Sequence, residues 1–123
     1  MRSVIAIAGL GLVVALAGPA SAQDAAAGKT AFPLRCGTCH QVADTKSGIT
    51  GPSLKGVVGR KVASLGDFNY STALKAKGGL WTPDDLDTYL SSPVKFAPGG
   101  KMYVAVTAPK DRADLIAYLK TVK

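Results

Sequence analysis

The sequence has 123 residues, enough for one small domain and too few for two cores of ordinary size. Its formal net charge is +7, but the lysines and arginines are scattered along the chain, which argues against a nucleic-acid-binding surface and favours an acidic protein partner. With two cysteines and one histidine, the chain lacks the second Cys or His cluster that would complete a structural zinc site.

Residues 1–22 are predicted to be a cleaved secretory signal. Arg2 gives a positive start, residues 4–17 form an apolar run, and Ala20-Ser21-Ala22 is a typical small-residue cleavage site. The run is shorter than the ~20 apolar residues that cross a bilayer and contains glycines, so a permanent membrane anchor is disfavoured. We therefore expect a protein exported to the periplasm, with residues 23–123 as its single domain and no stable membrane insertion.

The first predicted helix begins after Asp24, whose carboxylate can cap the alanines that follow. It is expected to continue toward Phe32. Because Pro33 lacks a backbone N–H and clashes with the carbonyl four residues back, at ~3 kcal/mol or more inside a helix, we expect a kink or an early stop there.

Cys36-Gly37-Thr38-Cys39-His40 is the most informative motif in the chain. Two cysteines at this spacing can bond to the two vinyl groups of one porphyrin, and the adjoining histidine can ligate its iron. A disulfide or a thioredoxin-like dithiol uses the same Cys-x-x-Cys spacing, but no strand–helix–strand alternation accompanies it here. The motif therefore predicts one covalently bound haem c.

Residues 41–67 show little helical periodicity and are interrupted repeatedly by glycine, so we predict a long loop. A structureless segment of this length is unusual in a compact domain. A buried cofactor would supply the packing partner that the loop lacks.

Three further helices are predicted, over residues 71–77, over residues 82–91 and from Pro109 onward. Thr82 provides a cap and Pro83 a first helical residue for the second of them. The last carries apolar residues at helical spacing: Leu115, Tyr118, Leu119 and Val122. Since no strand pattern or internal repeat is present, the predicted fold is all-α, with four to five short helices and long loops wrapped around one haem.

Several other stretches follow the cysteine motif at characteristic intervals. They are Gly51-Pro52-Ser53-Leu54, Gly59-Arg60-Lys61, Phe68-Asn69-Tyr70-Ser71, Pro98-Gly99-Gly100-Lys101-Met102 and residues 112–119. In order and spacing, the chain from residue 23 onward resembles the class I cytochromes c, most closely the mitochondrial-type group that includes soluble bacterial electron carriers. The resemblance implies a small cytochrome c fold.

The resemblance also implies an axial ligand pair, with His40 as the proximal ligand and Met102 as the distal one. Apart from the initiator, Met102 is the only methionine, and no second histidine competes with it. Lys101 could replace it only after losing a proton. His/Met ligation raises the reduction potential, and Pro52 would accept a hydrogen bond from the other ring nitrogen of His40.

Other positions match haem contacts in the family. Tyr70 and Trp81 match residues that bond a haem propionate, Arg60 matches a nearby positive charge, and Tyr89 matches a hydroxyl beside the methionine sulfur. Ordinary core packing is the alternative for these three aromatic residues. In the family, the first and last helices cross each other. The positions at that crossing match four residues of this chain: Gly28, Phe32, Leu115 and Tyr118.

The chain departs from the family pattern around the haem edge. Gly100 replaces a frequent hydroxyl residue, and Val104 replaces an aromatic that shields the edge, with Tyr103 beside it. Residues without charge stand where lysines are usual: Ile49, Val94 and Ala108. The cationic docking ring is therefore thinner, and three residues remain as docking candidates: Arg35, Lys95 and Lys101.

These observations predict a monomeric, soluble one-electron carrier that is not an enzyme, because both axial positions of its iron are filled. By resemblance it would shuttle electrons from a cytochrome bc complex to a terminal oxidase or a photosynthetic reaction centre, docking on acidic patches of these membrane complexes. Two alternatives remain open. One is a haem enzyme or gas-binding protein with a labile Met102, such as a weak peroxidase, and the other is a dedicated donor to one periplasmic enzyme.

Overall fold

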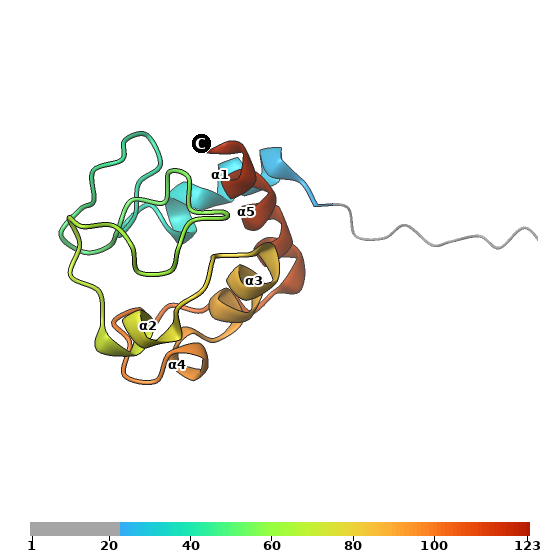
Figure 1. The fold of residues 1–123 in the computed structure, drawn as a ribbon. Helices are drawn as coiled ribbons and strands as arrows, with labels where there is room; N and C mark the ends of the chain where they lie inside the picture. Colours follow the sequence, from blue (N-terminus) through green and yellow to red (C-terminus); the bar gives the residue numbers. More distant parts are fainter. Residues whose placement is uncertain (1–22) are drawn as a thin grey trace, which may run out of the picture.

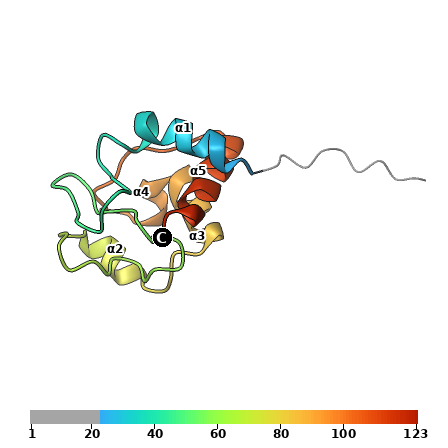
Figure 2. The ribbon, with the colours of Figure 1, turned by 90° about the horizontal axis from the view of Figure 1, so that it is seen from above.

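The computed structural model describes residues 23–123, so the predicted signal at 1–22 lies outside the described residues. The described part contains five helices: α1 (Ala25–Arg35), α2 (Thr72–Lys77), α3 (Pro83–Ser91), α4 (Pro93–Phe96) and α5 (Pro109–Thr121). Within it, strand pairing is limited to one isolated bridge between Lys61 and Leu80. The all-α prediction is confirmed. Figures 1 and 2 show the loop of residues 41–67 on one side of the molecule and α3 and α5 on the other.

Side-chain caps fix where the helices begin. The Asp24 carboxylate accepts hydrogen bonds from the backbone N–H groups of Ala26 and Ala27, at 2.9 and 3.1 Å. The hydroxyls of Ser71 and Thr82 cap α2 and α3 in the same way. Each cap satisfies N–H groups of a first turn that have no partner within the helix. These starts agree with the sequence prediction to within one residue.

Two features of the helices differ from the prediction. Helix α1 continues past Pro33 to Arg35, so the early stop was wrong. Pro33 lies near the end of the helix, and Lys29, whose carbonyl loses its N–H partner, is exposed to water that can replace it. Helix α4 was not predicted, because four residues are too few to show a periodicity, although Ser92 caps it and Pro93 begins it.

The crossing of α1 and α5 organises the helical half of the molecule. A Cβ atom on Gly28 would lie 2.0 Å from the backbone oxygen of Asp114, so only glycine permits this close approach. The rings of Phe32 and Tyr118 meet edge to face, with centroids 5.6 Å apart. Leu115, which belongs to the same core cluster as Phe32, is 1% exposed. All four residues predicted for the crossing are therefore found in it.

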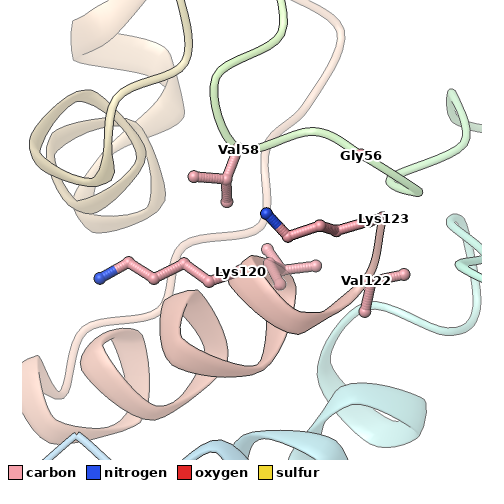
Figure 3. A pocket seen from close by; sticks show the side chains of 6 residues that line it. Gly56, Val58, Lys120, Val122 and Lys123 are labelled. Atoms are coloured by element: carbon pink, nitrogen blue, oxygen red, sulfur yellow. The ribbon is translucent and has the colours of Figure 1, made fainter.

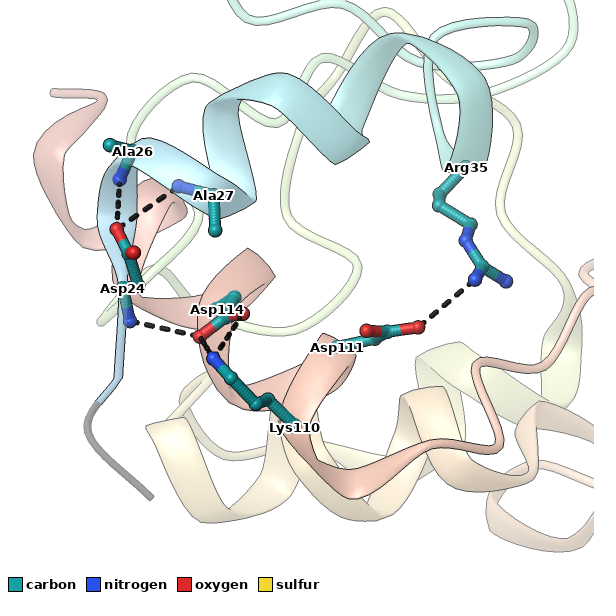
Figure 4. Close-up of polar contacts among 7 residues, drawn as sticks. All are labelled: Asp24, Ala26, Ala27, Arg35, Lys110, Asp111 and Asp114. Carbon is teal, nitrogen blue, oxygen red and sulfur yellow. Dashed lines mark hydrogen bonds and ion pairs between the residues drawn. The ribbon is translucent and has the colours of Figure 1, made fainter. Parts of the chain in front are cut away.

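Polar contacts fasten α5 to both ends of α1 (Figure 4). The buried carboxylate of Asp114 accepts a hydrogen bond from the Asp24 N–H at 2.9 Å and from Lys110 Nζ at 2.8 Å. These two contacts, the Lys110 bond foremost, lower the pKa of Asp114. At the other end of α1, Arg35 forms an ion pair with Asp111 at 3.0 Å.

The core lies between this crossing, α3 and the loop. Its buried residues are Phe32, Val57, Val62, Trp81, Leu86, Leu90, Val106, Leu115, Ile116 and Leu119. Cys36, Tyr89 and Met102 pack against it while only partly buried. Over residues 23–123, every helix is too short or too polar to cross a lipid bilayer.

Candidate functional site

The cysteine motif forms a tight turn directly after α1. The backbone N–H groups of Cys39 and His40 both donate to the carbonyl of Cys36, at 3.1 and 2.9 Å. Both cysteines are free, half-buried thiols. Burial raises the pKa of the Cys36 thiol to about 11, the opposite of the lowered pKa of a redox-active dithiol. One turn thus presents two thiols and an imidazole, and its chemistry disfavours the dithiol alternative.

The imidazole of His40 is fixed by the loop that follows it. Its Nδ1 lies 2.8 Å from the carbonyl oxygen of Pro52, so Nδ1–H donates to that oxygen and Nε2 carries the free lone pair. Gly51 lies against the ring, and a Cβ on it would come within 2.7 Å of His40 Cε1. Burial lowers the pKa of His40, more than the Pro52 hydrogen bond raises it. The result is an oriented, neutral imidazole whose Nε2 can ligate a metal.

Side chains within the loop hold Pro52 in place. The Ser47 hydroxyl donates to Asp67 Oδ1 at 2.7 Å and accepts from the Ser53 N–H at 3.1 Å. The fully buried hydroxyl of Ser53 donates to the carbonyl of Asp44 at 2.5 Å. Three residues of this network were not predicted as site residues, because serine and aspartate in a loop carry no distinguishing spacing: Ser47, Ser53 and Asp67.

Arg60 belongs to the same loop, and Tyr70 follows it. Burial lowers the pKa of Arg60 and raises the pKa of Tyr70, and each of the two groups partly opposes the shift of the other. The Arg60 guanidinium donates to the carbonyls of Ser53 and Lys55, at 2.9 and 3.1 Å. Its buried Nε has no hydrogen-bond partner among the described residues. A buried cationic N–H without a partner costs free energy, so this corner fits an anionic group such as a haem propionate.

Trp81 and Tyr89 belong to an aromatic cluster that also contains Phe96. The centroid of the Trp81 ring lies 5.0 Å from that of Tyr89 and 5.7 Å from that of Phe96. The backbone N–H of Trp81 donates to the carbonyl of Arg60 at 2.8 Å, which brings two predicted site residues together. Burial raises the pKa of Tyr89. Phe96 was missed because it lies in the unpredicted α4.

Met102 lies half-buried against the core, whereas the residues after it turn outward. Tyr103 is 76% exposed and Val104 is 59% exposed, so Tyr103 does not fold inward in place of the absent aromatic. Lys101 was the alternative to Met102 as an iron ligand. Its ammonium instead donates a hydrogen bond to the carbonyl of Asn69 at 2.6 Å. At Gly100, a Cβ would lie 2.9 Å from the carbonyl oxygen of Ala97.

The three docking candidates differ in how free their charges are. Arg35 is paired with Asp111, and Lys101 is bonded to Asn69. Lys95 is exposed and forms no ion pair with any described residue. Of the three charged groups, Lys95 is therefore the one with neither an ion pair nor a hydrogen bond to a described residue, whereas Lys101 keeps its charge but is held by Asn69.

Two shallow hollows are present on the described surface. One, at the end of α5 (Figure 3), is lined by Gly56, Val58, Leu119, Lys120, Val122 and Lys123, none of which is a predicted site residue. The other is lined by Ser47, Gly48, Ile49, Thr50, Asp67, Phe68, Asn69 and Lys101. Residues 23–123 contain no group of three or more Cys, His, Asp or Glu side chains that could hold a metal ion.

A small α-helical domain with two thiols and an oriented imidazole in one turn defines a haem-attachment protein, and comparison with known proteins agrees. The family model for Cytochrome c matches residues 25–123. This chain belongs to the cytochrome c family.

Individual relatives extend over most of the chain. It is 48% identical over 99 residues to the cytochrome c-type cyt cy of Rhodobacter capsulatus, covering 80% of this chain and 49% of that relative, so it spans about half of that protein's length. It is 42% identical over 100 residues to cytochrome c2 of Agrobacterium tumefaciens, covering 78% of this chain and 89% of that one. The solved structure of cytochrome cH from Methylobacterium extorquens is 45% identical, with a TM-score of 0.72, and covers 80% of this chain and 98% of that one.

Family members are electron carriers rather than enzymes and carry one covalently attached haem c. This chain accordingly binds one haem c. Its residues fit the group: Cys36 and Cys39 offer free thiols, His40 offers a bare Nε2, and Arg60 offers an unpartnered cationic N–H.

Proposed function

We propose that this chain is a soluble periplasmic one-electron carrier, with haem attached through Cys36 and Cys39 and with His40 and Met102 as axial ligands. The observation that carries the proposal is the 2.8 Å hydrogen bond from Nδ1 of His40, which lies in the turn that presents both thiols, to the carbonyl oxygen of Pro52 in the loop that follows. It fixes the tautomer whose Nε2 can bind iron. When bound, the haem supplies reversible one-electron chemistry between its ferric and ferrous states.

The chain's own residues keep that chemistry to electron transfer. With His40 and Met102 both ligating the iron, no position would be left for a substrate, and no ligand would have to change between oxidation states. Burial of the haem against the core would disfavour the extra charge of the ferric form and so raise the potential. Arg60, Tyr70 and Trp81 would hold the propionates, and Tyr89 would lie beside the sulfur of Met102.

Export and partners are part of the proposal. The leader at residues 1–22 would deliver the chain to the periplasm and be removed, which places it beside membrane redox complexes. Electrons would pass from a cytochrome bc complex to a terminal oxidase or a photosynthetic reaction centre. Docking on acidic patches would involve Lys95, with smaller contributions from Arg35 and Lys101, whose charges have partners within the chain.

An absorbance spectrum combined with a redox titration of the purified holoprotein tests the ligand assignment. We expect a six-coordinate, low-spin spectrum and a high potential in the wild type. Met102→Ala should keep the haem attached, lower the potential and admit carbon monoxide to the ferrous form. Val104→Ala, at the exposed neighbour, is the matched control and should resemble the wild type.

Two results would contradict the proposal. An unchanged potential in Met102→Ala would remove Met102 from the site. Rapid carbon monoxide binding to the wild-type ferrous protein at neutral pH would instead favour a haem enzyme or gas-binding protein with a labile sixth ligand.

A further inference from the structure

The peptide group between Pro52 and Ser53 is hydrogen-bonded at both ends. Its carbonyl oxygen accepts from His40 Nδ1 at 2.8 Å, and its N–H donates to Ser47 Oγ at 3.1 Å. The Ser47 hydroxyl in turn donates to Asp67 Oδ1 at 2.7 Å, and the Ser47 backbone N–H donates to Asp67 Oδ2 at 2.7 Å. A continuous series of hydrogen bonds therefore links a carboxylate to the imidazole.

From this geometry we propose that Ser47 and Asp67 are positioning residues that tune the electron donation of His40 to its iron. The inference rests on the proposed function, in which His40 is an axial ligand. We call the series from Asp67 through Ser47 and the Pro52–Ser53 peptide to His40 the loop relay.

All three bonds of the loop relay run in the same direction. The imidazole N–H donates to the peptide, the peptide N–H donates to the hydroxyl, and the hydroxyl donates to the carboxylate. Hydrogen bonds aligned head to tail polarise one another, so an anionic acceptor at one end strengthens each bond before it. The Pro52 oxygen becomes a better acceptor, and His40 becomes more electron-rich. An electron-rich imidazole stabilises the ferric state and lowers the potential.

The surroundings of Asp67 keep its carboxylate charged. The two bonds from Ser47 hold the pKa of Asp67 below its ordinary range, and Lys46 contributes in the same direction. Arg60 and Tyr70 are the other titratable groups that interact with it, and Lys101 lines the same hollow. A neutral acceptor in place of this carboxylate would weaken the whole series.

A mere brace for the loop would predict a different outcome from a tuning role. If these contacts only stabilise the loop, their removal changes the stability of the domain. If they tune His40, their removal changes the potential and the chemical shift of the His40 Nδ1–H while the domain stays folded. Ser47→Ala separates the two, because it removes the hydroxyl and leaves the charge of Asp67 in place. Any shift of potential in that variant cannot come from a lost charge.

The experiment uses the holoprotein and measures the potential together with the proton chemical shift of His40 Nδ1–H. We expect Ser47→Ala and Asp67→Asn each to raise the potential and to move the Nδ1–H resonance upfield, as its hydrogen bond weakens. Ser47→Thr restores a hydroxyl and should return both values toward the wild type. Asp44→Asn removes the same charge from the same loop and should leave the Nδ1–H resonance unchanged. The double variant of Ser47 and Asp67 should shift less than the two single shifts added together, since both interrupt one series.

Three results overturn the inference. The first is a wild-type potential and resonance in a six-coordinate Ser47→Ala protein, and the second is an Asp67→Asn variant that matches Asp44→Asn in both readouts. Each of these leaves the proposed function standing and removes only the loop relay. A wild-type spectrum without His40 ligation removes both the relay and the proposed function. Raised ionic strength provides a further check, because a direct effect of the exposed Asp67 charge is screened and the loop relay is not.

Discussion

The α1–α5 crossing and the loop of residues 41–67 are held together by different means. At the crossing, helices satisfy their own backbone, and stability comes from close approach at Gly28 and burial of Leu115. In the loop, backbone groups find partners in side chains, including those of Ser47, Ser53 and Arg60. The comparison indicates that the crossing governs whether the domain is folded, and that the loop governs how the imidazole of the site behaves.

The largest effect on stability is expected from a substitution that disrupts the α1–α5 crossing. Gly28→Ala places a Cβ 2.0 Å from the backbone oxygen of Asp114, so the helices must move apart. We expect a loss of about 3 kcal/mol in the free energy of unfolding, measured by urea titration of the holoprotein. The potential of the folded variant should stay at the wild-type value. A Gly28→Ala variant with wild-type stability and an altered potential would contradict this assignment, because the crossing would then affect the site rather than the stability of the fold.

The same substitution in the loop should act on the site. In Gly51→Ala the Cβ would lie 2.7 Å from His40 Cε1 and 2.8 Å from the Cys39 carbonyl oxygen. We expect a stability loss of about 2 kcal/mol and, in addition, a changed potential and a displaced His40 resonance. Gly66→Ala, where a Cβ meets nothing within 4 Å, is the matched control and should alter neither quantity.

Acid should weaken the crossing through Asp114. Because Lys110 and the Asp24 N–H lower its pKa in the folded state, ionised Asp114 stabilises the fold fully above the unfolded pKa of about 3.9. That contribution disappears as the pH falls through the lower, folded-state pKa. We therefore expect the stability difference between wild type and Asp114→Asn, from urea unfolding, to be constant above about pH 5 and to shrink toward pH 3. A difference that persists unchanged at pH 3 would show that ionisation is not its source.

The smallest expected effects concern docking. Lys95→Ala should slow electron transfer to a purified oxidase by about twofold at low salt, because it removes an unpaired exposed charge. Arg35→Ala should have less effect, since Asp111 already offsets its charge. Stopped-flow rates at low and high salt measure both. Equal losses in the two variants would indicate that the Arg35–Asp111 pair opens on docking.

Much of the helical half was predictable because its signals are local. Asp24, Thr82 and Pro109 each mark a helix start through side-chain or backbone chemistry within three residues, and the structure has helices at these points. The early stop predicted at Pro33 was wrong because the cost of a proline depends on its distance from the helix end. The sequence alone does not give the position of that end. The stop came two residues later, at Arg35.

The loop was predictable as a loop but not in its internal bonds. The Ser47–Asp67 contact joins residues 20 positions apart in a segment without periodicity, so its register depends on how the chain wraps. The Pro52 contact with His40 was foreseen only through resemblance to a family. The cluster of Trp81, Tyr89 and Phe96 was foreseen in part, since Phe96 depends on a four-residue helix.

The contact between Asp24 and Asp114 also constrains the order of events during biosynthesis. These residues are 90 positions apart, so α1 has no helical partner until the last segment of the chain has been made. Ordering such a distant contact is slow relative to local helix formation. Until then, Cys36 and Cys39 lie next to a helix without a helical partner, so we expect their thiols to be more accessible than the half-buried thiols of the folded domain. Because the α1–α5 contact forms late, the haem can be attached to the two cysteines before folding is complete.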